Sequence, residues 1–326
     1  MPELPEVESV RRGLSAWLTG STITRARVLD ARILGTTSAR NVPAERVVSF
    51  ERALEGVRIA SVERRGKYMW MPLAGDGLAG AGLVGSGLAG DGEAAEVGEW
   101  ALAMHLGMSG QARIHEADDP LHSHTRAVFD VAGPAGVAQL RFVDQRIFGH
   151  LGFERLVPGV AGTPGATGTA GERRLVAESA SEVGLDPFED GFSVPVVARA
   201  IARKNVAIKT ALLDQRVVSG VGNIYADEAL FEAGVHPAAR ASRLRISRIE
   251  RALEAARDVM ARALEVGGTS FDALYVNVNG ESGYFARSLN AYGLAGQPCM
   301  RCGTAIVREK FMNRSSFFCP VCQRKR

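Results

Sequence analysis

The sequence has no uninterrupted apolar run long enough to span a membrane and no N-terminal secretion signal. It has only four cysteines, and none lies before Cys299, so they form one site and are not scattered through a core. The net charge is small, +3 from 39 Lys and Arg against 36 Asp and Glu, which alone is weak support for nucleic-acid binding. We therefore expect a protein with no membrane segment, in the reducing cytoplasm.

Two low-complexity stretches divide a chain that is long enough for two or three domains. At 326 residues, with 46% apolar and 23% charged residues, the chain can build hydrophobic cores. Residues 74–98 are rich in glycine and alanine, and residues 156–174 are rich in proline, glycine, threonine and alanine. The first stretch predicts a flexible loop between two strands, and the second predicts a domain boundary.

The glycine-rich stretch contains GDGLAG at residues 75–80 and GSGLAG at residues 85–90, which match the G-x-G-x-x-G pattern of dinucleotide-binding folds. No amphipathic helix follows either copy, and the glycines continue on both sides. A glycine tract produces such matches by composition alone, so no nucleotide cofactor is predicted.

The part of the chain before the second stretch is rich in short strands. The expected strands span residues 23–28, 57–71, 100–106, 111–114, 126–131 and 137–143. Short strands separated by turn residues are typical of an antiparallel β-sandwich. A helix precedes them, because apolar residues recur there at helical spacing. Its apolar stripe consists of Leu4, Val7, Val10, Leu14, Trp17 and Leu18.

The part after the second stretch is helical. The expected helices span residues 193–204, 208–213, 223–233 and 246–266. The glycines at 220 and 222 permit a tight turn, and Asn223 stands where an N-cap residue is expected. Backbone N–H groups at such a helix start bind phosphate well. An ordinary capped helix explains the same residues, so both interpretations stay open on this pattern alone.

The chain ends with the spacing of a four-thiolate zinc site. Cys299 and Cys302 form one C-x-x-C pair, and Cys319 and Cys322 form a second pair sixteen residues later. This spacing lets four sulfurs reach one tetrahedral ion, so we predict one structural Zn²⁺. Two disulfides are the alternative, which the reducing compartment disfavours.

The segment between the cysteine pairs predicts a two-stranded ribbon. Residues 306–307 and 316–318 are its strands, and residues 313–315 are its turn, which would hold Arg314 outward. From Cys299 onward the chain carries seven Lys and Arg against one Glu. Such a basic segment favours contact with phosphates, although a solvated tail would have the same composition.

The first residues contain a candidate nucleophile and a candidate proton carrier. If Met1 is removed, Pro2 becomes a terminal secondary amine, and an α-amino group titrates near pH ~8, so an appreciable fraction is nucleophilic at neutral pH. Its attack on a sugar C1′ gives a cationic iminium that favours elimination, and Glu3 beside it can transfer protons. Equally, Pro2 and Pro5 could simply stiffen the start of a helix.

Taken together, MPELPEVE at residues 1–8, SGVGNIYADEALF at residues 219–231 and the paired C-x-x-C motifs resemble the formamidopyrimidine-DNA glycosylases. The resemblance covers nearly the whole chain except the two low-complexity stretches. It implies an α+β fold: an N-terminal helix with an antiparallel β-sandwich, a helix–two-turn–helix domain and a C-terminal zinc ribbon. We expect the N-terminal catalytic β-sandwich domain at residues 1–155, a linker at 156–184, the helix–two-turn–helix domain at 185–290 and the zinc finger at 291–326.

The same resemblance implies a bifunctional base-excision repair enzyme, a DNA glycosylase and abasic-site lyase. Such an enzyme removes oxidised purines, 8-oxoguanine and formamidopyrimidines, from damaged double-stranded DNA. It then cleaves the abasic site by β- and δ-elimination through a Schiff base, here on Pro2. We expect a monomer that works on the nucleoid in the cytoplasm.

The resemblance also implies roles for single residues. The implied catalytic residues are Pro2, Glu3, Lys67 and Arg314. The implied DNA-binding residues are His122 (or His124, two residues on), Lys204, Lys209 and Asn223 for phosphates, and Met108, Arg146 and Phe148 for filling the gap left by a flipped base. Residues 275–285 would fold over the flipped base. One departure is Leu294, which stands where the family has a basic residue.

Two other functions compete with this one. The sister endonuclease VIII-like glycosylases share the fold but take oxidised pyrimidines, and the PELPEVE start favours the purine enzymes over them. A non-catalytic zinc-dependent DNA-binding protein would explain everything after residue 185. Such a protein, however, has no use for a free Pro2 amine next to Glu3.

Overall fold

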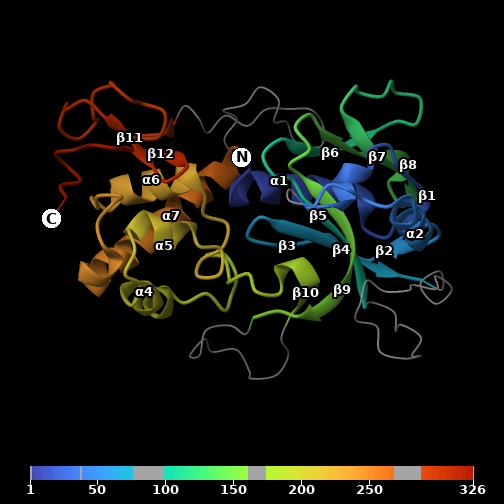
Figure 1. Cartoon of the computed structure of the whole chain (residues 1–326), viewed down its shortest axis with the longest axis horizontal. Coiled ribbons are helices and arrows are strands. Elements are labelled where there is room, and N and C mark those ends of the chain that lie inside the picture. The colour runs from blue at the N-terminus through green and yellow to red at the C-terminus, as the bar shows by residue number, and fades with distance from the viewer. Residues whose placement is uncertain (1, 37–38, 76–98, 161–173, 268–287, 326) are drawn as a thin grey trace.

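The computed structural model describes residues 2–36, 39–75, 99–160, 174–267 and 288–325. A β-rich half and a helical half lie side by side, with α1 between them and the β11–β12 hairpin on the helical side (Figure 1). The helices are α1 (Leu4–Leu18), α2 (Ala44–Leu54), α4 (Val194–Ala202), α5 (Ile208–Leu213), α6 (Asn223–Glu232) and α7 (Ile246–Glu265). Within the described ranges, no helix combines the length and apolarity needed to cross a membrane.

The strands of the β-rich half are all paired antiparallel. They are β1 (Thr22–Val28), β2 (Arg58–Ile59), β3 (Glu63–Arg65), β4 (Tyr68–Ala74), β5 (Trp100–His105), β6 (Gly110–His115), β7 (Thr125–Gly133), β8 (Gly136–Asp144), β9 (His150–Pro158) and β10 (Leu175–Ala177). The order is β10-β9-β5-β4-β2-β1-β7-β8-β6, with β3 paired to β4. The short β2 joins the two layers of the predicted β-sandwich, which is confirmed.

One hydrophobic core lies inside the sandwich and is closed by α1 and α2. Val7, Val10 and Leu14 of α1 pack there with side chains of β1, β4, β5, β7 and β8. Leu4, at the start of the same helix, packs instead into the core of the helical half. The helix α1 therefore contributes to both cores. Trp17, which we assigned to the apolar stripe, is 38% exposed, so that assignment was wrong.

Some strand and linker predictions were also wrong. The expected strand over residues 57–71 is interrupted, because Gly66 adopts φ +55° in a two-residue turn between β3 and β4. The strand β9 continues through Pro158, and β10 pairs with it, so parts of the expected linker belong to the sheet. The helix α2 was not predicted. Most of the glycine-rich stretch, residues 161–173 of the linker and the expected base-covering residues 275–285 lie outside the described residues.

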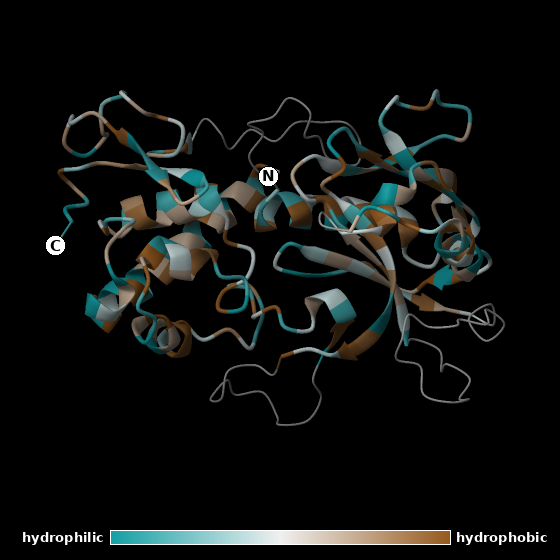
Figure 2. Ribbon diagram, in the orientation of Figure 1, coloured by the Kyte–Doolittle hydropathy of each residue, from teal (hydrophilic) through white to brown (hydrophobic). Residues whose placement is uncertain are grey.

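The helical half is built around α6, which is buried on all sides. Tyr225, Ala229 and Leu230 pack with α4, α5 and α7, and Phe231 packs with the C-terminal hairpin. The hairpin strands are β11 (Val307–Phe311) and β12 (Arg314–Phe318). Figure 2 shows apolar residues along the packed helices and hydrophilic residues at the end of the chain.

Candidate active site between the two halves

The carboxylate of Glu3 caps the N-terminus of α6, 219 residues away in sequence. It accepts hydrogen bonds from the backbone N–H groups of Gly222 (2.7 Å), Ile224 (2.9 Å) and Tyr225 (3.3 Å). A Cβ on Gly222 would lie 2.3 Å from Glu3 Cδ, so only glycine permits this approach. The predicted N-cap, Asn223, is instead the first residue of α6, and Gly222 is the N-cap residue. A distant acid therefore takes the role we gave to Asn223.

Glu3 is 1% exposed, and burial raises the pKa of its carboxyl above the ordinary value. The Lys67 ammonium and the backbone N–H groups oppose this shift, and Glu6 adds to it. Glu6 lies close, since its carboxylate accepts from the Glu3 N–H at 2.8 Å and from the Tyr225 hydroxyl at 2.9 Å. The upward shift favours the protonated form of the Glu3 carboxyl, which is the form that donates a proton in general acid catalysis. Pro2 is buried directly ahead of it.

Lys67 lies in the turn between β3 and β4 and reaches the same region. Its Nζ donates to the Val221 carbonyl at 3.0 Å, and the residue is 8% exposed. Burial lowers the pKa of Lys67, Arg314 lowers it further, and Glu3 opposes the shift. The structure thus brings Lys67 within electrostatic range of both Glu3 and Arg314. Arg314 itself is exposed and opens β12, because the hairpin turn is Met312-Asn313 and not residues 313–315.

Lys209 is not a phosphate contact, and that prediction was wrong. Its side chain is 0% exposed and forms an ion pair with the fully buried Asp227 at 2.7 Å. Its Nζ also donates to the Ser315 carbonyl at 3.0 Å, where the Asn223 side-chain amide donates as well. Lys209 therefore fastens β12 to α6. Lys204, by contrast, is 36% exposed in its pair with Asp214 and can be reached from solvent.

Replacing Lys209 by methionine should destabilise the protein by about 3–5 kcal/mol, because Asp227 would be left as a buried charge without its cation. The matched control is Lys204→Met, which breaks a half-exposed pair and should cost ~0–1 kcal/mol. Urea denaturation of both variants measures the difference. Equal stability of the two variants would contradict this role of Lys209.

The three residues expected to fill the DNA gap stand on two loops joined by Asp144. Its carboxylate accepts from the N–H groups of Arg146 (3.1 Å) and Gly149 (2.7 Å), and from the Ser109 hydroxyl on the other loop. The Arg146 guanidinium lies 4.6 Å from the Phe148 ring centroid, and Met108 is 36% exposed. A single buried carboxylate therefore holds together the two loops that present the exposed Met108 and Arg146 and the half-buried Phe148.

His122 and His124 share the loop between β6 and β7, with ring centroids 5.5 Å apart, and His122 is exposed. His105, at the end of β5, was not among the predicted site residues. Its Nδ1 accepts from the Gly107 N–H at 3.1 Å, so Nε2 carries the proton. Burial, with His150 and Lys67, lowers the pKa of His105 to about 3, so the ring is neutral at pH 7. The motif HLGMSG begins with this histidine, but we interpreted it only for Met108.

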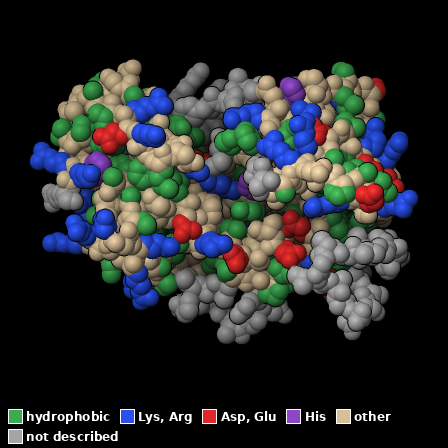
Figure 3. Space-filling view, viewed as in Figure 1, with side chains coloured by type: hydrophobic (Ala, Val, Ile, Leu, Met, Phe, Trp, Pro, Cys, Tyr) green, Lys and Arg blue, Asp and Glu red, His purple; other side chains and the backbone are tan. Residues whose placement is uncertain are grey.

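The four cysteine sulfurs of the hairpin base lie within 4.8 Å of one another. The Cys299–Cys322 distance is 4.0 Å, and the Cys302–Cys319 distance is 3.5 Å. A tetrahedral zinc ion with Zn–S bonds of ~2.3 Å requires sulfurs about 3.8 Å apart. The donor set therefore fits one structural Zn²⁺. Figure 3 shows that the surface is hollowed between the two halves, with Lys and Arg side chains in and around the hollow.

Sequence models of three domain families match the chain in order. They are the formamidopyrimidine-DNA glycosylase N-terminal domain (residues 1–151), the H2TH domain of the same glycosylases (183–274) and a zinc finger found in FPG and IleRS (296–324). The formamidopyrimidine-DNA glycosylase of Corynebacterium efficiens is 45% identical over 326 residues, covering 100% of both chains. That of Rhodococcus jostii is 45% identical over 325 residues, covering 99% of this chain and 96% of the relative.

Solved structures agree over the whole length. A Lactococcus lactis FPG mutant in complex with a Fapy-dG-containing DNA has a TM-score of 0.75 and 27% identity, covering 99% of this chain and 100% of that one. MutM in complex with DNA that contains carbocyclic 8-oxo-G has a TM-score of 0.74 and 26% identity with the same coverage. The matched domains, the full-length relatives and the solved structures thus agree, and the chain belongs to the formamidopyrimidine-DNA glycosylase family.

Proposed function

We propose that this protein removes oxidised purines from duplex DNA and cleaves the resulting abasic site. Full-length identity of 45% to formamidopyrimidine-DNA glycosylases supports this function. The observation that carries it is the buried Pro2-Glu3 end, held on α6 by three hydrogen bonds to one carboxylate. A protein that only bound DNA would need no such arrangement at its first residues. Four cysteines that hold a metal and form no disulfides are typical of a reducing compartment, which supports the cytoplasm.

The chemistry begins when the target nucleotide leaves the stack. Met108, Arg146 and Phe148 enter the gap, which offsets part of the unstacking cost of a few kcal/mol. With Met1 removed, the neutral Pro2 amine attacks C1′ and the bond from C1′ to the base breaks. The base leaves with a proton, and the amine loses one.

Ring opening then gives the iminium, as O4′ takes a proton that Glu3 can supply. Loss of a C2′ proton expels the 3′-phosphate, and a further proton loss expels the 5′-phosphate. Water finally hydrolyses the iminium and frees Pro2. Lys67 engages the base or a phosphate at the buried end, and Arg314 assists the late elimination from the hairpin. The zinc ion, when bound, braces that hairpin.

A second substrate class is favoured by one observation. A wild-type Lactococcus lactis FPG structure, with a TM-score of 0.74 and 27% identity, contains an oxidised-pyrimidine DNA. We therefore keep oxidised pyrimidines as the alternative substrates, as in the endonuclease VIII-like group.

Covalent trapping on a lesion panel tests the function. Protein from which Met1 has been removed is incubated with borohydride and duplexes that contain 8-oxoguanine opposite C, formamidopyrimidine or thymine glycol. We expect a trapped complex with the purine lesions and faster excision of them than of thymine glycol. An undamaged duplex is the control. No trapping and no excision on any lesion would leave only a DNA-binding protein, and faster excision of thymine glycol would reverse the substrate assignment.

A further inference from the structure

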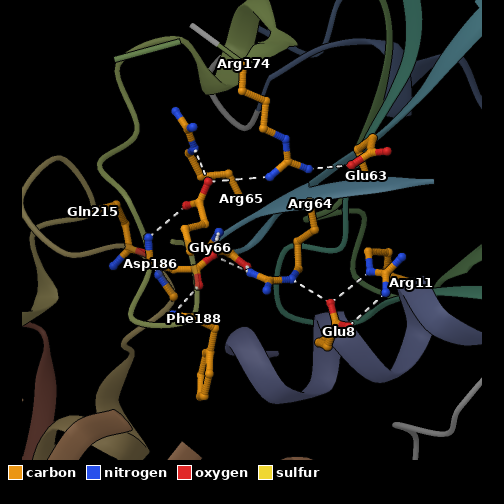
Figure 4. A network of polar contacts seen from close by, with 12 residues as sticks. Glu8, Arg11, Glu63, Arg64, Arg65, Gly66, Arg174, Asp186, Phe188 and Gln215 are labelled. Carbon is orange, nitrogen blue, oxygen red and sulfur yellow. Dashed lines mark hydrogen bonds and ion pairs between the residues drawn. The ribbon is translucent and has the colours of Figure 1, made fainter. Parts of the chain in front are cut away.

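Arg64, in β3, binds two carboxylates from different parts of the chain with one guanidinium group (Figure 4). Its Nε lies 3.0 Å from Glu8 Oε2 in α1, and its Nη1 lies 2.8 Å from Asp186 Oδ2 in the segment that leads into the helical half. The side chain is 9% exposed, and Asp186 is 0% exposed. Arg64 therefore links α1, β3 and the segment that leads into the helical half, inside the protein.

The same contacts fix the backbone of the turn that carries Lys67. Nη1 of Arg64 also donates to the Gly66 carbonyl at 3.0 Å, and the Gly66 N–H donates to Asp186 Oδ2 at 3.1 Å. Both polar groups of the Gly66 backbone are thus held by this ion pair. Lys67 is the next residue along the chain, so its backbone begins at a peptide group that this ion pair holds.

On its other side the turn lies against the helical half. A Cβ on Gly66 would lie 2.6 Å from Ser219 Cβ and 2.8 Å from the Gly220 nitrogen. Gly220 in turn accepts, through its carbonyl, the Leu4 N–H at 3.1 Å. Lys67 donates to Val221 within the same segment. The turn and the start of α1 therefore both contact the segment of Ser219, Gly220 and Val221. Arg64 also binds both of them, the turn through Gly66 and α1 through Glu8.

From this geometry we propose that Arg64 is a positioning residue of the active site. It acts through the Gly66 backbone and holds the Lys67 ammonium in place relative to Pro2 and Glu3. This inference rests on the proposed role of Lys67. A displacement of ~1 Å in a positioned group can lower a rate about 100-fold, which sets the scale of the expected effect.

The chain offers a matched control for the charge. Arg12 also binds Glu8, at 2.8 Å, but it is 61% exposed on α1. Arg12→Gln thus removes a cation from the same carboxylate, and Arg12 has no contact with Asp186 or with the turn among the hydrogen bonds and ion pairs of the described residues. A cavity of about 470 Å³ lies beside the network and is lined by Glu8, Arg64, Arg65, Asp186 and Glu189. Water from this cavity would reach the Gly66 backbone once the guanidinium is gone.

The test compares Arg64→Gln with Arg12→Gln in single-turnover excision of 8-oxoguanine at saturating enzyme. We expect the first to slow excision ~10–100-fold and the second less than about twofold. Affinity for a duplex with a tetrahydrofuran abasic analogue should change by less than about threefold in both, since Arg64 is buried and the proposed DNA contacts lie elsewhere. Arg64→Lys keeps the positive charge but lacks the several N–H donors of a guanidinium group, so its excision rate should lie between those of the other two variants.

The decisive measurement is a double-mutant cycle with Lys67→Met. If Arg64 acts through Lys67, Arg64→Gln should cause no further loss in the Lys67→Met background. A full additional loss there, or a normal rate for Arg64→Gln itself, overturns the inference. If Lys67→Met alone leaves excision unchanged, the proposed role of Lys67 fails instead. Should Arg64→Gln not fold, the same cycle with Arg64→Lys decides the question.

Discussion

Replacing Pro2 by glycine should slow excision of 8-oxoguanine and cleavage of an abasic site by at least roughly 100-fold, about 2.7 kcal/mol of activation free energy. The secondary amine of proline gives an iminium that is cationic at every pH, whereas the imine of a primary amine must first gain a proton. The change also leaves the Glu3 carboxylate and its hydrogen bonds to α6 in place. Single-turnover kinetics on both substrates measure the loss.

The control for this variant is Pro5→Ala, which alters the proline of the first turn of α1 and leaves the chain end untouched. It should keep a nearly normal rate. Both variants should bind the tetrahydrofuran duplex as the parent does, which shows that they fold. If Pro2→Gly cuts damaged DNA at the parent rate, the proposed nucleophile is wrong.

Loss of the zinc ion should abolish tight binding to damaged DNA. Structural zinc contributes about 10–16 kcal/mol in isolated zinc-finger peptides, and the hairpin that it braces carries Arg314. We predict that Cys319→Ser yields protein without zinc and with affinity for the tetrahydrofuran duplex reduced at least ~100-fold. Metal analysis and fluorescence anisotropy measure the two effects. Most side chains of the α5–α6–α7 core pack with one another, and Phe231 of α6 is the helical residue that belongs to the cysteine cluster, so the helical signal should largely remain.

Met300→Ser is the matched control, since Met300 lies between two ligands in sequence but is 73% exposed. It should retain one zinc ion per chain and normal affinity. A zinc-free Cys319→Ser variant that binds and cuts normally would show that the zinc finger has no part in DNA binding.

Local patterns in the sequence predicted local structure well. The helix at residues 208–213 was placed correctly, and the two C-x-x-C pairs indicated a cluster that the structure brings together. The residues that determine the helix lie within a few turns of each other, and the four cysteines lie at the base of one short ribbon. The antiparallel sandwich also followed from short alternating strands.

Contacts between distant segments were not predictable in the same way. Lys209 has the pattern of a surface lysine, and only its pairing with Asp227 across two helices makes it a buried anchor. Glu3 caps a helix that begins 220 residues later, so no local rule could connect them. Asn223 satisfied the local N-cap rule, but the carboxylate from the other half replaced it. The candidate active site is assembled from such contacts, which is why the residues of the N-terminus alone left a purely structural role of Pro2 open until the resemblance was considered.

The central claim is that the Pro2 nitrogen forms a covalent bond with the deoxyribose of damaged DNA. The most direct test is to trap the complex with borohydride, digest it and locate the sugar adduct by tandem mass spectrometry. We predict an adduct on the N-terminal peptide, at Pro2, with Met1 absent. An adduct on Lys67, or catalytically active protein that still carries Met1, would contradict the account.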